Sequence, residues 1–206
     1  MTLLSARDLS VARGGILLLE GVSFDVAAGD ALILRGANGI GKTSLLRCLV
    51  GLQRPVSGQV KVAPDCAAYA AHLDGIKPTL SVSENLSFWR AVFGGPAIEP
   101  AITAMNLAAL AQRDAGALSA GQRRRVTMAR VMVSGRPLWV LDEPTVSMDA
   151  ASVSLVEDAI AQHRAAGGAV IVALHGQTDI PEARVLDLTA HRAATPAHPS
   201  FDEAFA

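Results

Sequence analysis

Residues 36–43 read Gly36-Ala37-Asn38-Gly39-Ile40-Gly41-Lys42-Thr43, a complete G-x-x-x-x-G-K-T pattern. An apolar run at 31–35 predicts a strand before it, and the spacing of residues 43–50 predicts a helix after it. Glycines let such a loop curl so that its N–H groups, together with the helix N-terminus, face phosphate oxygens. We therefore expect residues 36–43 and Ser44 to bind a nucleotide, with Lys42 at the β- and γ-phosphates and Thr43 on Mg²⁺. The alternative, a chance glycine-rich turn with an exposed lysine, does not explain the strand and helix on either side.

Two carboxylates follow a second apolar run. Residues 138–141 predict a strand, and Asp142 and Glu143 come directly after it. Ligands of α/β sheets bind at the carboxyl ends of the strands, so these side chains are expected at the ligand edge. Asp142 suits a Mg²⁺ ligand, bound directly or through water, and Glu143 suits the base that orients an attacking water. Taken alone, the pair is equally compatible with an ordinary solvated turn.

The remaining pattern predicts an α/β protein with a parallel sheet. The expected elements are a hairpin at 3–11 and 16–26, two strands within 56–71, a mostly helical block at 82–134, a helix at 150–165, a strand at 169–174 and a short strand at 184–188. Aromatic and apolar residues crowd the start of the helical block, which favours a surface for a partner. Those residues are Leu86, Phe88, Trp89, Val92 and Phe93.

Composition narrows the classes of function. The 206 residues carry 18 Lys+Arg against 19 Asp+Glu, so no bulk basic surface is available for nucleic acid. The short basic run Arg123–Arg125 is therefore interpreted as a solvated helix face or a partner contact. The longest apolar runs fall short of the roughly 18 residues that a membrane-spanning helix needs. We expect one domain that neither binds nucleic acid nor spans a membrane, and the combination of lysine and carboxylates argues against a pure scaffold.

A third motif, Leu118-Ser119-Ala120-Gly121-Gln122, precedes a helical run. Ser119 and Gln122 have the spacing of a capping box, and a well-capped helix is the simplest interpretation. Together with the phosphate loop and Asp142-Glu143, however, the motif resembles the signature of the ATP-binding cassette (ABC) ATPases. The resemblance implies a P-loop NTPase core of ABC ATPase type, with an N-terminal antiparallel β subdomain and a helical signature subdomain.

The resemblance also implies site residues and boundaries. A single domain would cover residues 1–190, with the helical subdomain at about 75–135 and a mobile tail at 191–206. Ser119, Gly121 and Gln122 would contact ATP bound to the other subunit of an ATP-dependent homodimer. His175 would contact the γ-phosphate as a catalytic residue beside Lys42 and Glu143. ATP and Mg²⁺ would be the cofactors.

Further stretches narrow the resemblance. Residues 69–77, 84–86, 118–126 and 137–139 look like the haem-exporter subunit of cytochrome c maturation, the CcmA family. This implies an ATPase that is peripheral on the cytoplasmic side of the inner membrane and pairs with separate membrane-spanning subunits. The ATPase subunit of another ABC transporter is the first alternative, and an ABC-type ATPase without a transport role is the second.

Two positions depart from the usual ABC pattern. Many ABC ATPases stack adenine on an aromatic ring near the first turn, where this sequence has Arg13, whose guanidinium plane is the expected substitute. His72 stands where a glutamine that contacts metal and water is usual. Imidazole suits Mg²⁺ poorly, so His72 is expected to act through water, to contact a partner, or only to pack at the strand end.

Overall fold

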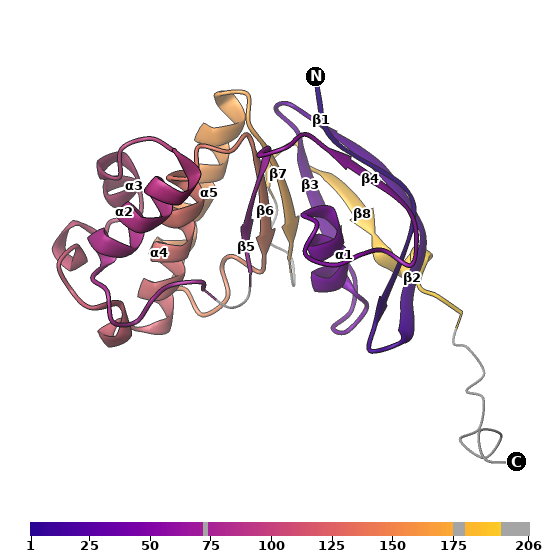
Figure 1. Ribbon diagram of the computed structural model, residues 1–206, viewed down its shortest axis with the longest axis horizontal. Helices are drawn as coiled ribbons and strands as arrows, with labels where there is room; N and C mark the ends of the chain where they lie inside the picture. Colours follow the sequence, from indigo (N-terminus) through magenta and orange to yellow (C-terminus); the bar gives the residue numbers. More distant parts are fainter. Residues whose placement is uncertain (72–73, 175–179, 195–206) are drawn as a thin grey trace, which may run out of the picture.

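The computed structural model describes residues 1–71, 74–174 and 180–194. Two sheets lie side by side in it, with helices grouped beyond one of them (Figure 1). The antiparallel sheet has the order β2-β1-β4, and the parallel sheet has the order β5-β6-β7-β3-β8. The predicted fold class, including the antiparallel subdomain and the helical subdomain, is confirmed.

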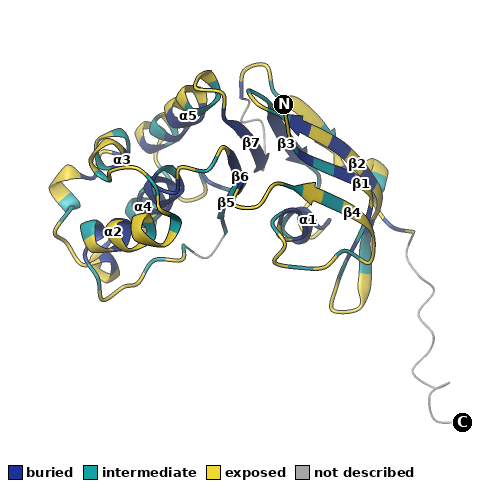
Figure 2. Cartoon of the chain, turned by 45° about the horizontal axis from the view of Figure 1, so that its top comes forward, coloured by how far each residue is buried: buried dark blue, intermediate teal, exposed yellow. Residues whose placement is uncertain are grey.

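The strands follow the apolar pattern closely. Their bounds are β1 Thr2–Arg13, β2 Ile16–Ala27, β3 Ala31–Arg35, β4 Ser57–Val62, β5 Ala67–Ala70, β6 Leu138–Asp142, β7 Ala169–Ala173 and β8 Arg184–Asp187. β6 and β7 are buried along their whole length, as expected for central strands of a parallel sheet covered on both faces. Figure 2 shows both strands in the colour of buried residues, between the group of helices on one side and the antiparallel sheet on the other.

The helices cover the parallel sheet from both sides. Their bounds are α1 Lys42–Leu49, α2 Val82–Phe93, α3 Glu99–Ala104, α4 Ala120–Met132 and α5 Ala150–Ala165, with 3-10 turns at Ala108–Leu110, Ala115–Ala117 and Leu188–His191. α1 shares one apolar core with both sheets, whereas α2, α4 and α5 pack over the other face of the parallel sheet. No helix of these described residues has the length and hydropathy that crossing a bilayer requires.

The chain remains attached to the fold beyond the point where the sequence predicted a tail. Arg192 forms a β-bridge with Leu19, and the N–H of Ala193 donates to Leu18 O at 3.0 Å. Ala193 is also buried. These contacts hold Arg192 and Ala193 against β2, and residues 195–206 of the predicted tail lie outside the described part of the chain.

Candidate functional site

The phosphate loop joins β3 to α1 and has the backbone that its glycines permit. Gly41 is the N-cap of α1 with φ +118°, and a Cβ there would lie 3.2 Å from the side chains of Leu18 and Leu19. Both the left-handed conformation and the close approach favour glycine. No side chain caps the helix, so its first N–H groups face the loop. This N-terminus offers the partial positive charge that an anion binds.

Lys42 lies across the loop. Its Nζ donates to Gly36 O at 2.7 Å and to Ala37 O at 3.2 Å, and the residue is buried. Burial lowers the pKa of Lys42, while the carboxylates of Glu143 and Asp142 raise it. Neutral carbonyls are weaker acceptors for an ammonium than phosphate oxygens are. The lysine is thus placed to exchange these two contacts for a phosphate.

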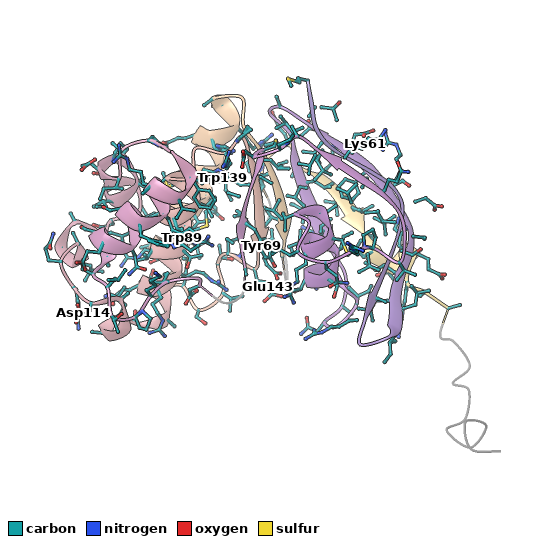
Figure 3. All side chains as sticks on the ribbon, viewed as in Figure 1. Lys61, Tyr69, Trp89, Asp114, Trp139 and Glu143 are labelled. Carbon is teal, nitrogen blue, oxygen red and sulfur yellow. The ribbon has the colours of Figure 1, made fainter. Side chains whose placement is uncertain are left out.

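Asp142 ends β6 and is almost wholly buried, with 2% of its surface exposed. The Tyr69 hydroxyl at the end of β5 donates to Asp142 Oδ2 at 3.4 Å. Burial and the Asp142 carboxylate raise the pKa of Tyr69, so this hydroxyl stays protonated and remains a donor. Figure 3 shows Tyr69 and Glu143 at the same end of the parallel sheet.

Glu143 has a backbone conformation that is rare for a side-chain-bearing residue. Its φ is +52°, in the left-handed region, which costs on the order of 1 kcal/mol. The Glu143 N–H still donates to Ala173 O at 3.0 Å, so the ladder between β6 and β7 continues to this point. The chain then turns away from the sheet, and Glu143 lines a cavity.

That cavity brings Arg13, part of the phosphate loop and Glu143 together, whereas Asp142 is not part of its lining. Its volume is about 450 Å³, and it is lined by Arg13, Ile16, Leu18, Asn38, Gly39, Gly41, Lys42, Thr43, Ser44 and Glu143. The hairpin turn between β1 and β2 therefore supplies one wall and the phosphate loop supplies another. A polyanion with an attached ring system suits this combination of a cationic floor and a partly apolar wall.

Three residues at this site were not predicted from the sequence. Ile16 and Leu18 stand beside Arg13 in the cavity wall, and Tyr69 reaches Asp142 from the neighbouring strand. Ile16 is 53% exposed although it is apolar, and an apolar residue directly after a glycine turn was the available signal. For Tyr69 the signal was a single tyrosine at the end of a predicted strand.

The signature motif begins α4, and its residues are not part of the cavity lining. Gln122 N–H donates to Ser119 Oγ at 3.2 Å, and Ser119 N–H donates to Gln122 Oε1 at 2.9 Å. The capping box predicted from the sequence is confirmed. A Cβ on Gly121 would lie 3.0 Å from Ser147 O, so glycine also permits close packing against the loop after β6. None of the three motif residues lines the cavity.

The basic run at the start of α4 contacts the chain's own backbone, so its interpretation as a solvated helix face needs correction. Arg125 Nη1 donates to Met105 O at 2.9 Å and to Asn106 O at 2.7 Å. Arg123 and Arg124 likewise donate to carbonyl oxygens, and Arg124 is buried. These guanidiniums join α4 to neighbouring segments of the helical subdomain.

His72 and His175 lie outside the described residues. Within the described part of the chain, no group of three or more His, Cys, Asp or Glu residues could hold a metal ion. Mg²⁺ needs no such group, because it is commonly bound by one or two carboxylates together with water and substrate phosphates. Asp142 and Thr43 supply oxygen donors of the kind that Mg²⁺ prefers, so the residues present fit this ion.

Comparisons with known proteins agree with the geometry. The profile of the ABC transporter family matches residues 19–146. The cytochrome c biogenesis ATP-binding export protein CcmA of Rhodobacter capsulatus is 58% identical over 196 residues, which cover 95% of this chain and 92% of that protein. The protein of the same name from Paracoccus denitrificans is 54% identical over 209 residues and 100% of both chains. A Pyrococcus furiosus ABC transporter ATP-binding protein superposes with a TM-score of 0.82 at 24% identity, covering 92% of this chain and 99% of that one.

Proposed function

This chain belongs to the ABC transporter family, among the cytochrome c biogenesis ATP-binding export proteins, and we propose that it couples ATP hydrolysis to haem export or handling for c-type cytochromes. The observation that carries the ATPase is the cavity in which the phosphate loop, Lys42 and Glu143 meet. The cytochrome pathway rests on identity of more than half over nearly the whole chain. ATP is the substrate, and the protein is a hydrolase that acts within a transport complex.

In the proposed mechanism the loop residues 36–44 hold the phosphates of ATP. Backbone N–H groups at the start of α1 and the Lys42 ammonium bind the β- and γ-phosphate oxygens. Thr43 and Asp142 would hold Mg²⁺, which when bound neutralises charge that develops on the phosphates. Glu143 accepts the proton of the attacking water, because its backbone turns the carboxylate into the cavity.

The second nucleotide face comes from a homodimer in this proposal. Ser119 is exposed at the N-terminus of α4, and the motif residues Ser119, Gly121 and Gln122 do not line the cavity of their own chain. A second copy, arranged head to tail, would bring this helix N-terminus to the γ-phosphate. His175 is assigned to the same phosphate on the resemblance alone.

The adenine site is assigned to Arg13, Ile16 and Leu18, which line one wall of the cavity. Stacking on an aromatic ring contributes about 1 to 3 kcal/mol per base, and this wall has no ring. We expect ATP and GTP affinities within about tenfold of each other, or roughly 1.4 kcal/mol. Competition against a fluorescent nucleotide measures both. Arg13→Ala should weaken ATP and GTP alike, whereas Arg54→Ala, at an exposed residue away from the cavity, should weaken neither. An ATP preference of several hundredfold would place the base elsewhere.

Membrane-spanning subunits are the proposed partners, on the cytoplasmic side of the inner membrane. Two large hydrophobic residues of α2 are exposed, Phe88 at 37% and Val92 at 57%. The rings of Trp89 and Phe93 stack with centroids 5.5 Å apart. Both of these rings line a groove of about 510 Å³ between the helical subdomain and the sheet. Leu86 is buried, so the docking surface is expected to comprise the other four residues.

Val92→Gln tests this docking surface. The residue is largely exposed, so the folded chain should tolerate glutamine, while an apolar contact with the membrane subunit is lost. We expect several-fold less membrane subunit to co-purify, with ATP affinity unchanged. Val185→Gln is the matched control. Val185 is similarly exposed, at 52%, but it lies on β8, the edge strand of the parallel sheet opposite β5. Equal recovery with both variants would remove α2 from the interface.

Loss of the gene tests the proposed function. Cells without this chain should lack covalently haem-bound c-type cytochromes while other haem proteins persist. The parent gene should restore haem staining of those cytochromes, and Glu143→Gln should not. Normal c-type cytochromes in the deletion strain would favour the ATPase subunit of another transporter, which identification of the co-purified membrane subunit would then reveal.

A further inference from the structure

Asp74 lies between β5 and α2, and its carboxylate faces three side chains of α4. Thr127 Oγ1 donates to Asp74 Oδ1 at 3.3 Å, and Arg124 Nη1 lies 3.5 Å from the same oxygen. Arg123 Nε lies 3.8 Å from Oδ2. Thr127 and Arg124 are buried, and the Asp74 side chain is 29% exposed. One partly buried carboxylate thus offsets part of the charge of two guanidiniums on the signature helix. The Arg124 side chain is only 7% exposed, so its ion pair with Asp74 is less screened than a surface pair.

Arg123 contacts both Asp74 and the signature motif. Its Nη1 donates to Leu118 O at 2.7 Å, directly before the N-cap residue Ser119. Its backbone N–H donates to Ser119 O at 2.9 Å as part of the first turn. Leu118 is buried in the core, and its carbonyl oxygen is fixed by the hydrogen bond from Arg123. The path Asp74–Arg123–Leu118 therefore ends one residue before Ser119, the N-cap of α4.

The segment that carries Asp74 is fixed on both sides. Ala71 O accepts a hydrogen bond from Arg124 Nη1 at 3.0 Å, and Gly75 O accepts one from Trp89 Nε1 at 3.1 Å. These two bonds tie Ala71 to α4 and Gly75, the neighbour of Asp74, to α2. At 3.8 Å the carboxylate attracts the Arg123 guanidinium through its charge and not through a short hydrogen bond.

We propose that Asp74 is a positioning residue for ATP hydrolysis, which orients the N-terminus of α4 toward the nucleotide of the partner subunit by holding Arg123. This inference rests on the proposed head-to-tail dimer. A helix N-terminus stabilises an anion only over its first turn, so a small tilt of Ser119 and Gly121 weakens their contact with the γ-phosphate. Asp74 itself touches no nucleotide.

Asp74→Asn is the central test, because it keeps the size of the side chain and removes its charge. We expect ATP affinity within about twofold of the parent and kcat lower by about tenfold. Amide hydrogen exchange over residues 118–123 should become several-fold faster, since the cap is held less firmly. Asp65→Asn is the matched control: Asp65 Oδ1 pairs with Arg136 Nη2 at 2.9 Å, away from the signature motif. The control should change neither quantity.

Arg123→Gln should reproduce both effects of Asp74→Asn, and the double variant should be no slower than either single variant, because both remove the same contact. Asp74→Glu, which keeps the charge, should recover part of the rate. Retained ATP affinity reports that each variant is folded. Unchanged exchange at 118–123, or fully additive losses of rate, would overturn the proposal.

Mixed dimers separate this inference from the function on which it rests. Asp74→Asn chains mixed with Lys42→Ala chains should exceed the mean activity of the two preparations, because one composite site keeps an intact loop and an intact signature. Asp74→Asn mixed with Gly121→Asp should not. If Gly121→Asp complements Lys42→Ala and Asp74→Asn does not, Asp74 has no role in the signature face. If neither complements, the head-to-tail dimer fails, and the exchange at 118–123 alone decides whether Asp74 holds the cap.

Discussion

Glu143→Gln lowers steady-state ATP hydrolysis by about 10² or more and leaves ATP affinity within a few-fold of the parent, as the loss of a general base predicts. Glutamine has nearly the same shape as glutamate but cannot take the proton of water. In the proposed mechanism the phosphate contacts come from the loop and Lys42 and not from Glu143, so we expect binding to be retained. Because hydrolysis is what separates the dimer in this scheme, we also expect a dimer that stays trapped with ATP.

Purified parent and variant chains are compared by phosphate release and by size after incubation with ATP. Glu157→Gln is the matched control, since Glu157 lies on α5 outside the nucleotide cavity and should retain the parent rate. Unchanged turnover in Glu143→Gln would assign the base to another residue. A loss of ATP affinity as large as the loss of rate would instead mean that Glu143 holds the loop together.

The parts of the fold that the sequence predicts best are those with a strong local signal. β6 and β7 are buried along their whole length and read as continuous apolar runs, and α5 spans Ala150–Ala165 as predicted. Asp149 starts that helix because its carboxylate accepts the Ser152 N–H at 2.8 Å. Local patterns of this kind can be recognised in the sequence without knowledge of the fold.

The division of the helical block between 82 and 134 into separate elements is harder to predict from the sequence. It divides into three helices and two 3-10 turns, and one break falls at Gly94, which ends α2 in the left-handed conformation. A glycine there was a visible signal. Gly116 likewise marks the turn at Ala115–Ala117. The turn at Ala108–Leu110, in contrast, is held by tertiary hydrogen bonds such as Ser83 N–H to Ala111 O at 2.9 Å. Contacts between distant segments leave no periodic pattern in the sequence.

The candidate site divides in the same way. The loop at 36–43 and Asp142-Glu143 are placed by their own strands, so spacing alone predicts where they lie. Ile16 and Leu18 enter the cavity only because the β1–β2 hairpin reaches the loop. Arg123–Arg125 read as a solvated basic run, yet they bind carbonyl oxygens whose positions depend on the folded helical subdomain. Long-range geometry decides both cases.

We expect Lys42→Ala and Gly121→Asp each to abolish hydrolysis, and an equal mixture of the two chains to recover part of it. Alanine removes the ammonium that we propose binds the β- and γ-phosphates. Aspartate at 121 puts a carboxylate at a helix N-terminus that faces a phosphate, and its Cβ meets Ser147 O at 3.0 Å. In a head-to-tail dimer of one chain of each kind, one site carries both defects and the other carries neither.

Random pairing makes half of the dimers mixed, and each mixed dimer has one intact site of two, so the mixture should reach about a quarter of the parent rate. Lys42→Ala mixed with Glu143→Gln is the negative control, because both residues line the same cavity and every mixed dimer then has two defective sites. Phosphate release is measured after cross-linking has shown that mixed dimers form. Mixed dimers that stay as inactive as the separate variants would mean that the loop and the signature motif of one chain serve the same nucleotide. The separation of Ser119, Gly121 and Gln122 from the cavity lining of their own chain argues for the opposite result.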